Sequence, residues 1–309
     1  MDKFKLIDSI KVLYQNGGNI IQYLRDIDKR NFNTIEDILI SYDFQAGSYV
    51  KNFYSNQDFQ EKYTRTIGSI INKLGRFNSV MEAGVGESTT LGAMIKYLDQ
   101  PPRHIFGFDL SWSRLNFAQN FLKDQSVANT TLFTSDLFEI ALPNNSVDLV
   151  YTSHSVEPNG GKEREALTEL YRVAKKYLVL LEPSYEFGSE EARQRMQKLG
   201  YVTNLYKTSV DLGYEVIEHR IFDLYNNPLN PTGLLIIKKN SQEAEINEPY
   251  LACPATKAKL KESDGVLYSE QSLLAYPILK TIPCLLKQNA ILATHFNMDY
   301  DKFKSSMKD

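Results

Sequence analysis

Apolar residues in the first 75 positions recur every three or four residues, the spacing that puts them on one face of a helix. Asn16-Gly17-Gly18 interrupts this spacing, and Asn33-Thr34 ahead of Glu36 resembles the start of a further helix. We therefore expect about four helices in this region. Their apolar stripes are Phe4, Leu6, Ile7, Ile10 and Leu13; Ile20, Ile21 and Leu24; Ile38, Leu39 and Ile40; and Ile67, Ile70, Ile71 and Leu74.

From Ser79 onward, short apolar runs alternate with amphipathic stretches. The predicted strands are 79–83, 104–108, 130–133, 147–151, 177–181, 214–222 and 234–238, and the predicted helices are 88–98, 111–122, 163–174 and 190–199. Strands separated by helices imply parallel neighbours, so the fold class is α/β with a doubly wound, mostly parallel seven-stranded sheet. The last two strands are joined only by the turn Asn226–Gly233, which predicts an antiparallel hairpin at one edge.

Composition narrows the class of partner. The net charge of −3 gives no basic footprint, so nucleic acid is not a favoured partner. No apolar run reaches the length of a membrane-spanning helix, and the first residues lack the apolar run of a signal peptide. Two cysteines, Cys253 and Cys284, are too few for a disulfide framework. We therefore expect a cytoplasmic protein without membrane contact.

A glycine turn follows the first strand. Val80 to Ser88 reads as a buried strand, a tight turn through Gly84 and Gly86, and the start of a helix. Such a junction presents backbone N–H groups and small residues to a nucleotide-like ligand. The dinucleotide fingerprint needs a third glycine, and Thr89 stands in its place, which counts against a nicotinamide or flavin enzyme.

Three acidic residues follow at the strand boundaries. Asp109, at the end of the second strand, suits a ribose diol, although a helix N-cap is the competing interpretation. Asp136 follows the third strand, where a carboxylate beside Leu137 suits adenine, and a plain turn residue is the alternative. Asp148 opens the fourth strand and is expected to be structural. That strand ends in Thr152–Glu157, where a substrate would lie.

With these pieces in place, residues 60–240 resemble the class I S-adenosylmethionine-dependent methyltransferases. The matching pieces are Glu82-Ala83-Gly84-Val85-Gly86, Asp109, Asp136, Asp148, the helix containing Glu169-Leu170-Tyr171-Arg172-Val173, and the terminal hairpin. The resemblance implies S-adenosylmethionine as cofactor and a Rossmann-like methyltransferase domain over residues 61–240. It also implies that the N-terminal helices, residues 1–60, form a lid.

The resemblance assigns roles to single residues. Gly84 and Gly86 are expected under the methionine part of the cofactor, Asp109 at the ribose hydroxyls and Asp136 at adenine. Glu82 anchors either the turn or the cofactor's amino group, and Tyr42 in the lid closes the site or packs in the core. The remaining expected cofactor contacts are Leu110, Leu137 and Ser153.

Methyl transfer needs a general base only when the acceptor must lose a proton. His154 and Glu157, just after the fourth strand, are the catalytic candidates, because imidazole titrates near neutral pH and both side chains follow the strand's carboxyl end. A histidine that only packs or caps the loop is the alternative.

The last segment carries a second resemblance. After a polar linker over residues 240–248, residues 249–309 resemble a small zinc-ribbon domain like the activator subunit of certain tRNA and protein methyltransferases. A zinc ribbon needs four ligands, usually in Cys-x-x-Cys pairs, but Cys253 is followed by Thr256, and Ser269 and Gln271 stand where a second pair is expected. We therefore predict no metal ligands here, and a tail that covers the main domain, contacts another protein or self-associates.

Three functions remain open. The leading hypothesis is an enzyme that methylates a small polar metabolite such as a sugar or a nucleotide-linked sugar. The tail alone suggests a tRNA or protein methyltransferase, and the third hypothesis is a non-catalytic cofactor-binding scaffold. The sequence leaves the acceptor atom undetermined.

Overall fold

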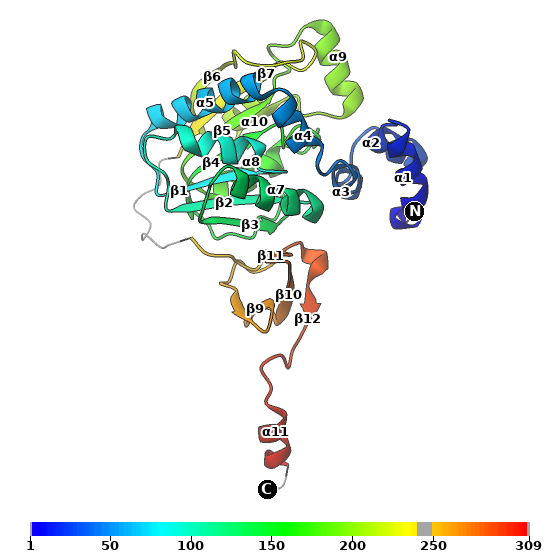
Figure 1. Ribbon diagram of the computed structural model, residues 1–309, viewed down its shortest axis with the longest axis vertical. Coiled ribbons are helices and arrows are strands. Elements are labelled where there is room, and N and C mark those ends of the chain that lie inside the picture. The colour runs from blue at the N-terminus through cyan, green and yellow to red at the C-terminus, as the bar shows by residue number, and fades with distance from the viewer. Residues whose placement is uncertain (1, 240–248, 308–309) are drawn as a thin grey trace.

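A seven-stranded sheet forms the centre of the molecule, in the order β3-β2-β1-β4-β5-β7-β6 (Figure 1). The computed structural model describes residues 2–239 and 249–307. The strands are β1 (Ser79–Ala83), β2 (His104–Asp109), β3 (Thr130–Thr134), β4 (Val147–Ser153), β5 (Ala174–Pro183), β6 (Glu215–Ile221) and β7 (Thr232–Lys238). β1 to β5 pair in parallel, and β7 is antiparallel to both β5 and β6. The predicted α/β class, doubly wound sheet and antiparallel edge hairpin are confirmed.

The strands alternate buried side chains between two separate cores. Val80 of β1 packs with the helices on one face, and its neighbour Met81 packs on the other. Because successive residues of a strand point to opposite faces, a sheet covered on both sides reads as a continuous apolar run. The helices of the first face are α5 (Gln57–Leu74), α6 (Thr89–Met94) and α7 (Trp112–Asp124), and those of the second are α8 (Glu163–Val173) and α10 (Leu205–Asp211).

The N-terminal region differs from the prediction in its helix count. Five α-helices precede β1, where about four were expected: α1 (Ile7–Gln15), α2 (Ile20–Asp28), α3 (Ile35–Phe44), α4 (Ser48–Ser55) and α5, with a 3-10 turn at Lys3–Leu6. The missed helix is α4. It is short and buries only Phe53, so its sequence lacks the apolar stripe on which the prediction depended.

Several boundaries also moved. The predicted helix 88–98 is α6 followed by a 3-10 turn at Ile95–Tyr97, and α10 was not predicted because only Ser209 of its seven residues is buried. α9 (Glu190–Leu199) has the predicted bounds. α5 crosses residue 60, the expected boundary between lid and main domain.

The tail adds a small second sheet beneath β3 (Figure 1). Its elements are β8 (Lys261–Ser263), β9 (Val266–Ser269), β10 (Leu274–Leu279), β11 (Ile282–Pro283), a 3-10 turn at Lys287–Asn289, β12 (Ile291–Leu292) and α11 (Tyr300–Ser306). Cys284 bridges Thr134 in parallel, and the Leu285 amide donates to the Thr134 carbonyl at 3.1 Å. The tail therefore contacts the edge strand of the main sheet at the end of β3. The predicted linker, 240–248, lies outside the described residues.

Tail side chains extend one of the two cores. Cys253, Leu267, Tyr276 and Leu285 belong to the same buried cluster as residues of β1, β4 and α8. The tail is thus packed against the main domain by apolar burial. No helix among the described residues is long and apolar enough to cross a membrane.

Candidate cofactor and acceptor site

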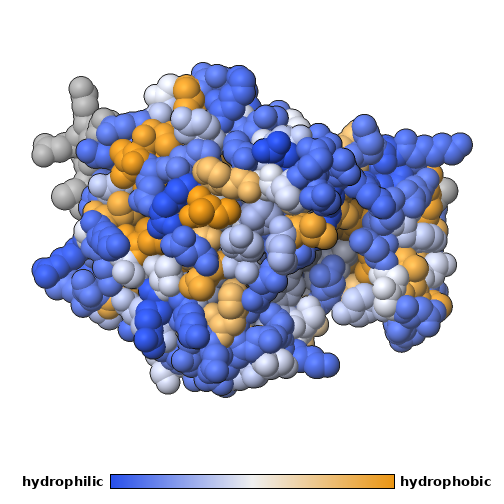
Figure 2. Space-filling view, turned by 90° about the horizontal axis from the view of Figure 1, so that it is seen from above, coloured by the Kyte–Doolittle hydropathy of each residue, from blue (hydrophilic) through white to orange (hydrophobic). Residues whose placement is uncertain are grey.

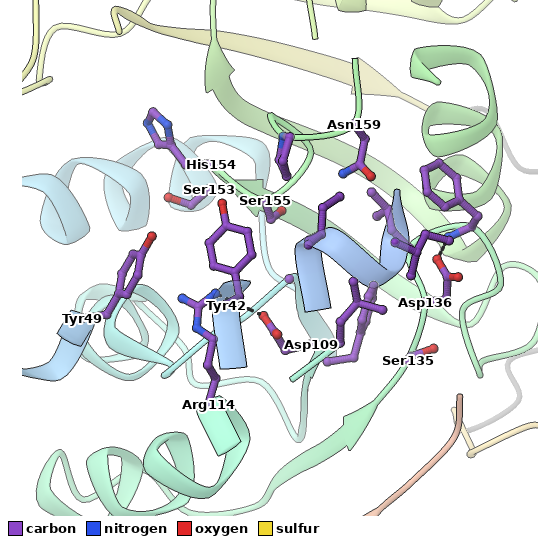
Figure 3. A pocket seen from close by; sticks show the side chains of 18 residues that line it. Tyr42, Tyr49, Asp109, Arg114, Ser135, Asp136, Ser153, His154, Ser155 and Asn159 are labelled. Atoms are coloured by element: carbon purple, nitrogen blue, oxygen red, sulfur yellow. Dashed lines mark hydrogen bonds and ion pairs between the residues drawn. The ribbon is translucent and has the colours of Figure 1, made fainter. Parts of the chain in front are cut away.

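A pocket opens at the carboxyl ends of β1 to β4, with α3 lying across it (Figure 3). In a doubly wound sheet this is the edge where strand order reverses and ligands bind. The cavity within this lining measures about 100 Å³ and is continuous with open space at its mouth. Eight expected site residues line it: Tyr42, Gly84, Asp109, Leu110, Asp136, Leu137, Ser153 and His154.

The remaining three expected residues lie beside this pocket. Glu82 and Glu157 line an adjoining cavity, which shares Gly84, Ser153 and His154 with the first. Gly86 lines neither cavity, but its amide donates to Asp109 at 3.0 Å.

The glycine turn requires its two glycines. Gly84 and Gly86 have φ of +69° and +54°, where other side chains are strained. A Cβ added at Gly84 would lie 2.3 Å from the Ser155 Cβ, and one at Gly86 would lie 2.3 Å from a guanidinium nitrogen of Arg114. Each glycine is therefore needed both for its backbone conformation and for the close approach of a neighbouring side chain.

Asp109 is fixed by backbone donors. One carboxylate oxygen accepts from Gly86 and the other accepts from Ser111 at 2.9 Å. The N-cap of α7 is Ser111, whose hydroxyl accepts from Arg114, so the N-cap interpretation of Asp109 is wrong. The buried carboxylate keeps lone pairs on the pocket side, since each oxygen accepts one backbone N–H.

Asp136 has both a turn role and a place in the pocket. Its carboxylate accepts from the Phe138 amide at 3.0 Å, which is an Asx turn. Burial raises the pKa of this carboxyl, and the Phe138 amide opposes the shift. Leu137, Phe138 and Phe108 add apolar walls around the carboxylate, as a slot for a purine ring would need.

Sequence analysis missed Arg114. The side chain lies beside Asp109, with Nη1 3.7 Å from the carboxylate, and its guanidinium lies over the rings of Tyr42 at 5.1 Å and Tyr49 at 4.4 Å (Figure 3). Its Nε is buried without a hydrogen-bond partner. The only sequence signal was its position in the first turn of the helix after Asp109, which does not distinguish it from a surface arginine.

Two carboxylates fasten the N-terminal helices over the pocket. Asp43, at the end of α3, accepts from both hydroxyls of Ser111 and Ser113. Glu87, in the glycine turn, accepts from the amides of Gly47, Tyr49 and Val50 at the start of α4. The α3–α4 segment is therefore tied to both loops that form the pocket floor.

His154 and Glu157 form a hydrogen-bonded pair. His154 has φ of +56°; its Nδ1 lies 2.9 Å from a Glu157 carboxylate oxygen and its Nε2 lies 2.8 Å from the Thr232 hydroxyl. Burial lowers the pKa of His154, but the hydrogen bond and the charge of Glu157, with that of Glu182, outweigh burial and raise it. His154, Glu157 and Thr232 all line the adjoining cavity.

Glu182 holds the loop that carries this pair. Its carboxylate accepts from the amides of Ser155, Val156 and Glu157 at 3.0 to 3.2 Å. Burial raises the pKa of Glu182 to about 7. Glu82 on β1 is similarly buried, receives a hydrogen bond from Tyr151 at 2.9 Å, and has its pKa raised by burial to about 8.

The adjoining cavity, called the acceptor cavity below, lies between α4, α5, the glycine turn and the loop joining β6 to β7. Its lining combines neutral amides and aromatic rings with His154, Glu157 and Thr232, and the charged side chains Glu82, Glu87 and Arg114 also reach it. The amides are Asn52, Gln60, Asn226, Asn227 and Asn230, and the rings are Tyr49, Phe59, Tyr63 and Tyr225.

These residues fit S-adenosylmethionine. Asp109 offers acceptors for a diol, and Asp136 with Leu137 and Phe138 offers an apolar slot ending in a carboxylate. The buried Arg114, with an unpartnered Nε, offers a cation for the methionine carboxylate. The first pocket and the acceptor cavity share Gly84, Ser153 and His154 in their linings, so the two adjoin at these residues.

Comparisons with known proteins match part of the chain to methyltransferases. Residues 80–177 match the family model described as a methyltransferase domain. No curated protein sequence matches the chain.

Solved methyltransferase structures are similar to part of the chain. A magnesium protoporphyrin IX methyltransferase from Synechocystis with bound SAH is 14% identical, with 58% of this chain and 83% of that chain covered and a TM-score of 0.46. A SAM-dependent methyltransferase from Aquifex aeolicus is 18% identical, with 55% and 87% covered and a TM-score of 0.42. An O-methyltransferase family protein from Burkholderia thailandensis is 17% identical, with 60% and 59% covered and a TM-score of 0.46.

Proposed function

We propose that the chain, which contains a methyltransferase domain, is a class I S-adenosylmethionine-dependent methyltransferase that transfers the methyl group to a small, neutral polar group such as a sugar hydroxyl. The observation that carries this proposal is the acceptor cavity. Its amides supply paired donors and acceptors, and its aromatic rings supply flat apolar faces. That combination suits a polyhydroxylated ring better than an extended apolar acceptor.

The cofactor is held by residues of the first pocket in this proposal. Asp109 binds the ribose hydroxyls, Asp136 and Leu137 bind adenine, and Arg114 binds the methionine carboxylate. The bound cofactor supplies an activated methyl group on a sulfonium, so the protein contributes orientation and exclusion of water. Tyr42 and Tyr49, fastened by Asp43 and Glu87, close the pocket from above.

The His154–Glu157 pair is the proton acceptor for a hydroxyl nucleophile. With Nδ1–H donating to Glu157, the Nε2 of His154 accepts from the Thr232 hydroxyl, and a substrate hydroxyl takes the place of that donor. Glu157 then stabilises the imidazolium that forms. Glu182 keeps His154 and Glu157 in this geometry by holding the backbone of their loop.

Calorimetry with S-adenosylhomocysteine tests the cofactor placement. Asp109→Ala removes a charged acceptor worth roughly 1.5–3 kcal/mol, so affinity should fall about tenfold to hundredfold. Asp8→Ala, at an exposed position on α1, is the matched control. Unchanged affinity in Asp109→Ala, or tight NAD binding by the wild type, contradicts the proposal.

Methylation of a panel of sugars and sugar phosphates, followed by mass spectrometry, tests the acceptor class. A mass increase of one methyl group on a hydroxylated ring supports the proposal. Methylation restricted to tRNA or protein, or cofactor binding without turnover, favours one of the two alternative functions.

A further inference from the structure

A third cavity lies between the α1–α2 hairpin and the rest of the molecule. Figure 2 shows the N-terminal helices as a lobe on the right, set off from the body by a notch. The cavity, called the N-terminal cavity below, is lined by the turn before α2, by α3 and α4, and by residues near the end of α9. Tyr49 and Glu157 line both this cavity and the acceptor cavity, so the two meet beside the His154–Glu157 pair.

Arg25 is a buried cation in the wall of the N-terminal cavity. It is 4% exposed, and one guanidinium nitrogen donates to Gln22 and to the Lys198 carbonyl, both at 2.9 Å. The other nitrogens, Nε and Nη1, are buried without a hydrogen-bond partner. No carboxylate of the described residues forms an ion pair with Arg25, whereas the other buried cations, Lys3 and Arg114, each have one.

An unpaired buried charge is costly, because it has lost its hydration without gaining a counter-ion. The free energy of this arrangement therefore falls when an anion binds. The same wall contains the start of α2, where Asn19 caps the helix by accepting from Gln22. A helix N-terminus adds positive potential. The carboxylate on the opposite wall, Glu157, is already paired with His154.

We propose that the N-terminal cavity binds a phosphate carried by the acceptor, with Arg25 and the start of α2 as its recognition elements. This inference rests on the proposed function, since it places the acceptor's hydroxyl at His154 and its phosphate beyond Tyr49 and Glu157. The acceptor class is then a phosphorylated or nucleotide-linked sugar rather than a free sugar.

Phosphate binding tests the inference on protein saturated with S-adenosylhomocysteine. Inorganic phosphate is titrated by calorimetry into wild type, Arg25→Gln and Arg103→Gln, with acetate as a second anion. Arg103 is an exposed arginine outside the cavity and controls for lost charge. We expect saturable phosphate binding in wild type and Arg103→Gln, and affinity at least about tenfold weaker in Arg25→Gln.

A second variant, which keeps Arg25, distinguishes loss of the phosphate site from misfolding caused by loss of Arg25. Ile21→Glu puts a carboxylate at the lining of the same cavity, and it should also abolish phosphate binding. Equal phosphate affinity in all variants, no saturable binding in wild type, or binding of acetate as tight as that of phosphate would overturn the inference. The S-adenosylhomocysteine titration reports separately on the proposed function, because the Arg25 and Ile21 variants should bind this ligand normally.

Discussion

At the scale of single residues, the site depends on buried carboxylates that backbone amides hold in place by hydrogen bonds. Asp109 and Glu87 accept from two and three backbone amides around the pocket. Such charge-assisted hydrogen bonds hold a carboxylate in one orientation before any ligand arrives. The geometry of the site is therefore largely preorganised.

Substitution of His154 or Glu157 should slow methyl transfer without weakening cofactor binding. We expect His154→Ala and Glu157→Gln to reduce single-turnover methyl transfer by about 10²–10⁴-fold while S-adenosylhomocysteine affinity is kept. His295→Ala, at an exposed tail position, is the control. Small losses of rate, or losses that follow weaker cofactor binding, would assign the pair to loop structure only.

Ionisation of the buried Glu82 carboxyl should make the folded state less stable as pH rises. Burial raises its pKa from 4.5 to about 8, so the folded protein holds a proton that the unfolded chain has released. The stability contributed by the neutral carboxyl is therefore full below about pH 4.5 and is lost as pH rises toward 8. Glu182, raised from 4.5 to about 7, acts in the same direction.

Thermal unfolding between pH 5 and pH 8 measures this effect. We expect Tm to fall with rising pH in the wild type and to fall less steeply in Glu82→Gln, which stays neutral throughout. An identical pH dependence in both proteins would show that Glu82 ionises normally in the folded state.

At the scale of elements, the α3–α4 segment owes its position to two carboxylates. Glu87 satisfies three amides at the start of α4, a helix that has no side-chain cap of its own and buries only Phe53. Little apolar burial means that local opening of α4 is opposed mainly by these hydrogen bonds.

Removing Glu87 should loosen α4 without unfolding the protein. We expect Glu87→Ala to speed amide hydrogen exchange in α4 about tenfold to hundredfold, the equivalent of roughly 1–3 kcal/mol, and to speed release of S-adenosylhomocysteine. Glu190→Ala, in the exposed first turn of α9, is the matched control. Unchanged exchange in α4 would mean that packing alone holds the segment.

Elements with a dense apolar pattern were predictable from sequence, and those held by polar contacts were not. β1 and α9 have the predicted bounds because their apolar positions and flanking turns are unambiguous. α4 and α10 bury one residue each, so no stripe marked them. The site follows the same division: Asp109 and Asp136 stand at strand ends, whereas Arg114 acquires its place only through contacts with Tyr42, Tyr49 and Asp109.

At the scale of the whole molecule, the tail and the N-terminal helices serve different edges of one sheet. The tail contacts the β3 edge at Thr134, which bridges Cys284 and accepts from the Leu285 amide, so it covers the carboxyl end of that edge strand. The N-terminal helices cover the carboxyl edge, where cofactor and acceptor meet. The sequence resemblance of the tail to a zinc ribbon did not indicate this edge pairing, because register between distant strands has no local signal.

The contacts around Cys253 allow a test of the expectation that the tail binds no zinc. Two pairs of residues, each separated by two positions, lie together in the tail: Cys253 with Thr256, and Ser269 with Ser272. Cys253 Sγ lies 3.4 Å from the Ser272 hydroxyl and hydrogen-bonds to Thr256. The Ser272 amide donates to Ser269. Three hydroxyls thus occupy positions where a ribbon needs thiolates. Among the described residues, no group of three or more histidine, cysteine or acidic side chains is placed to hold a metal.

We expect the purified wild-type protein to contain no stoichiometric zinc. The variant Thr256→Cys/Ser269→Cys/Ser272→Cys should bind one zinc per chain, because it completes four thiolates at the spacing that tetrahedral zinc requires. Cys284, whose thiol donates to the Ile282 carbonyl, lies at the β3 edge, so Cys284→Ser should leave zinc binding by the triple variant unchanged. Elemental analysis measures the zinc content of the tag-free wild type, of the triple variant and of the triple variant with Cys284→Ser. Stoichiometric zinc in the wild type would contradict the prediction, and no zinc in the triple variant would show that the four positions do not form a ribbon site.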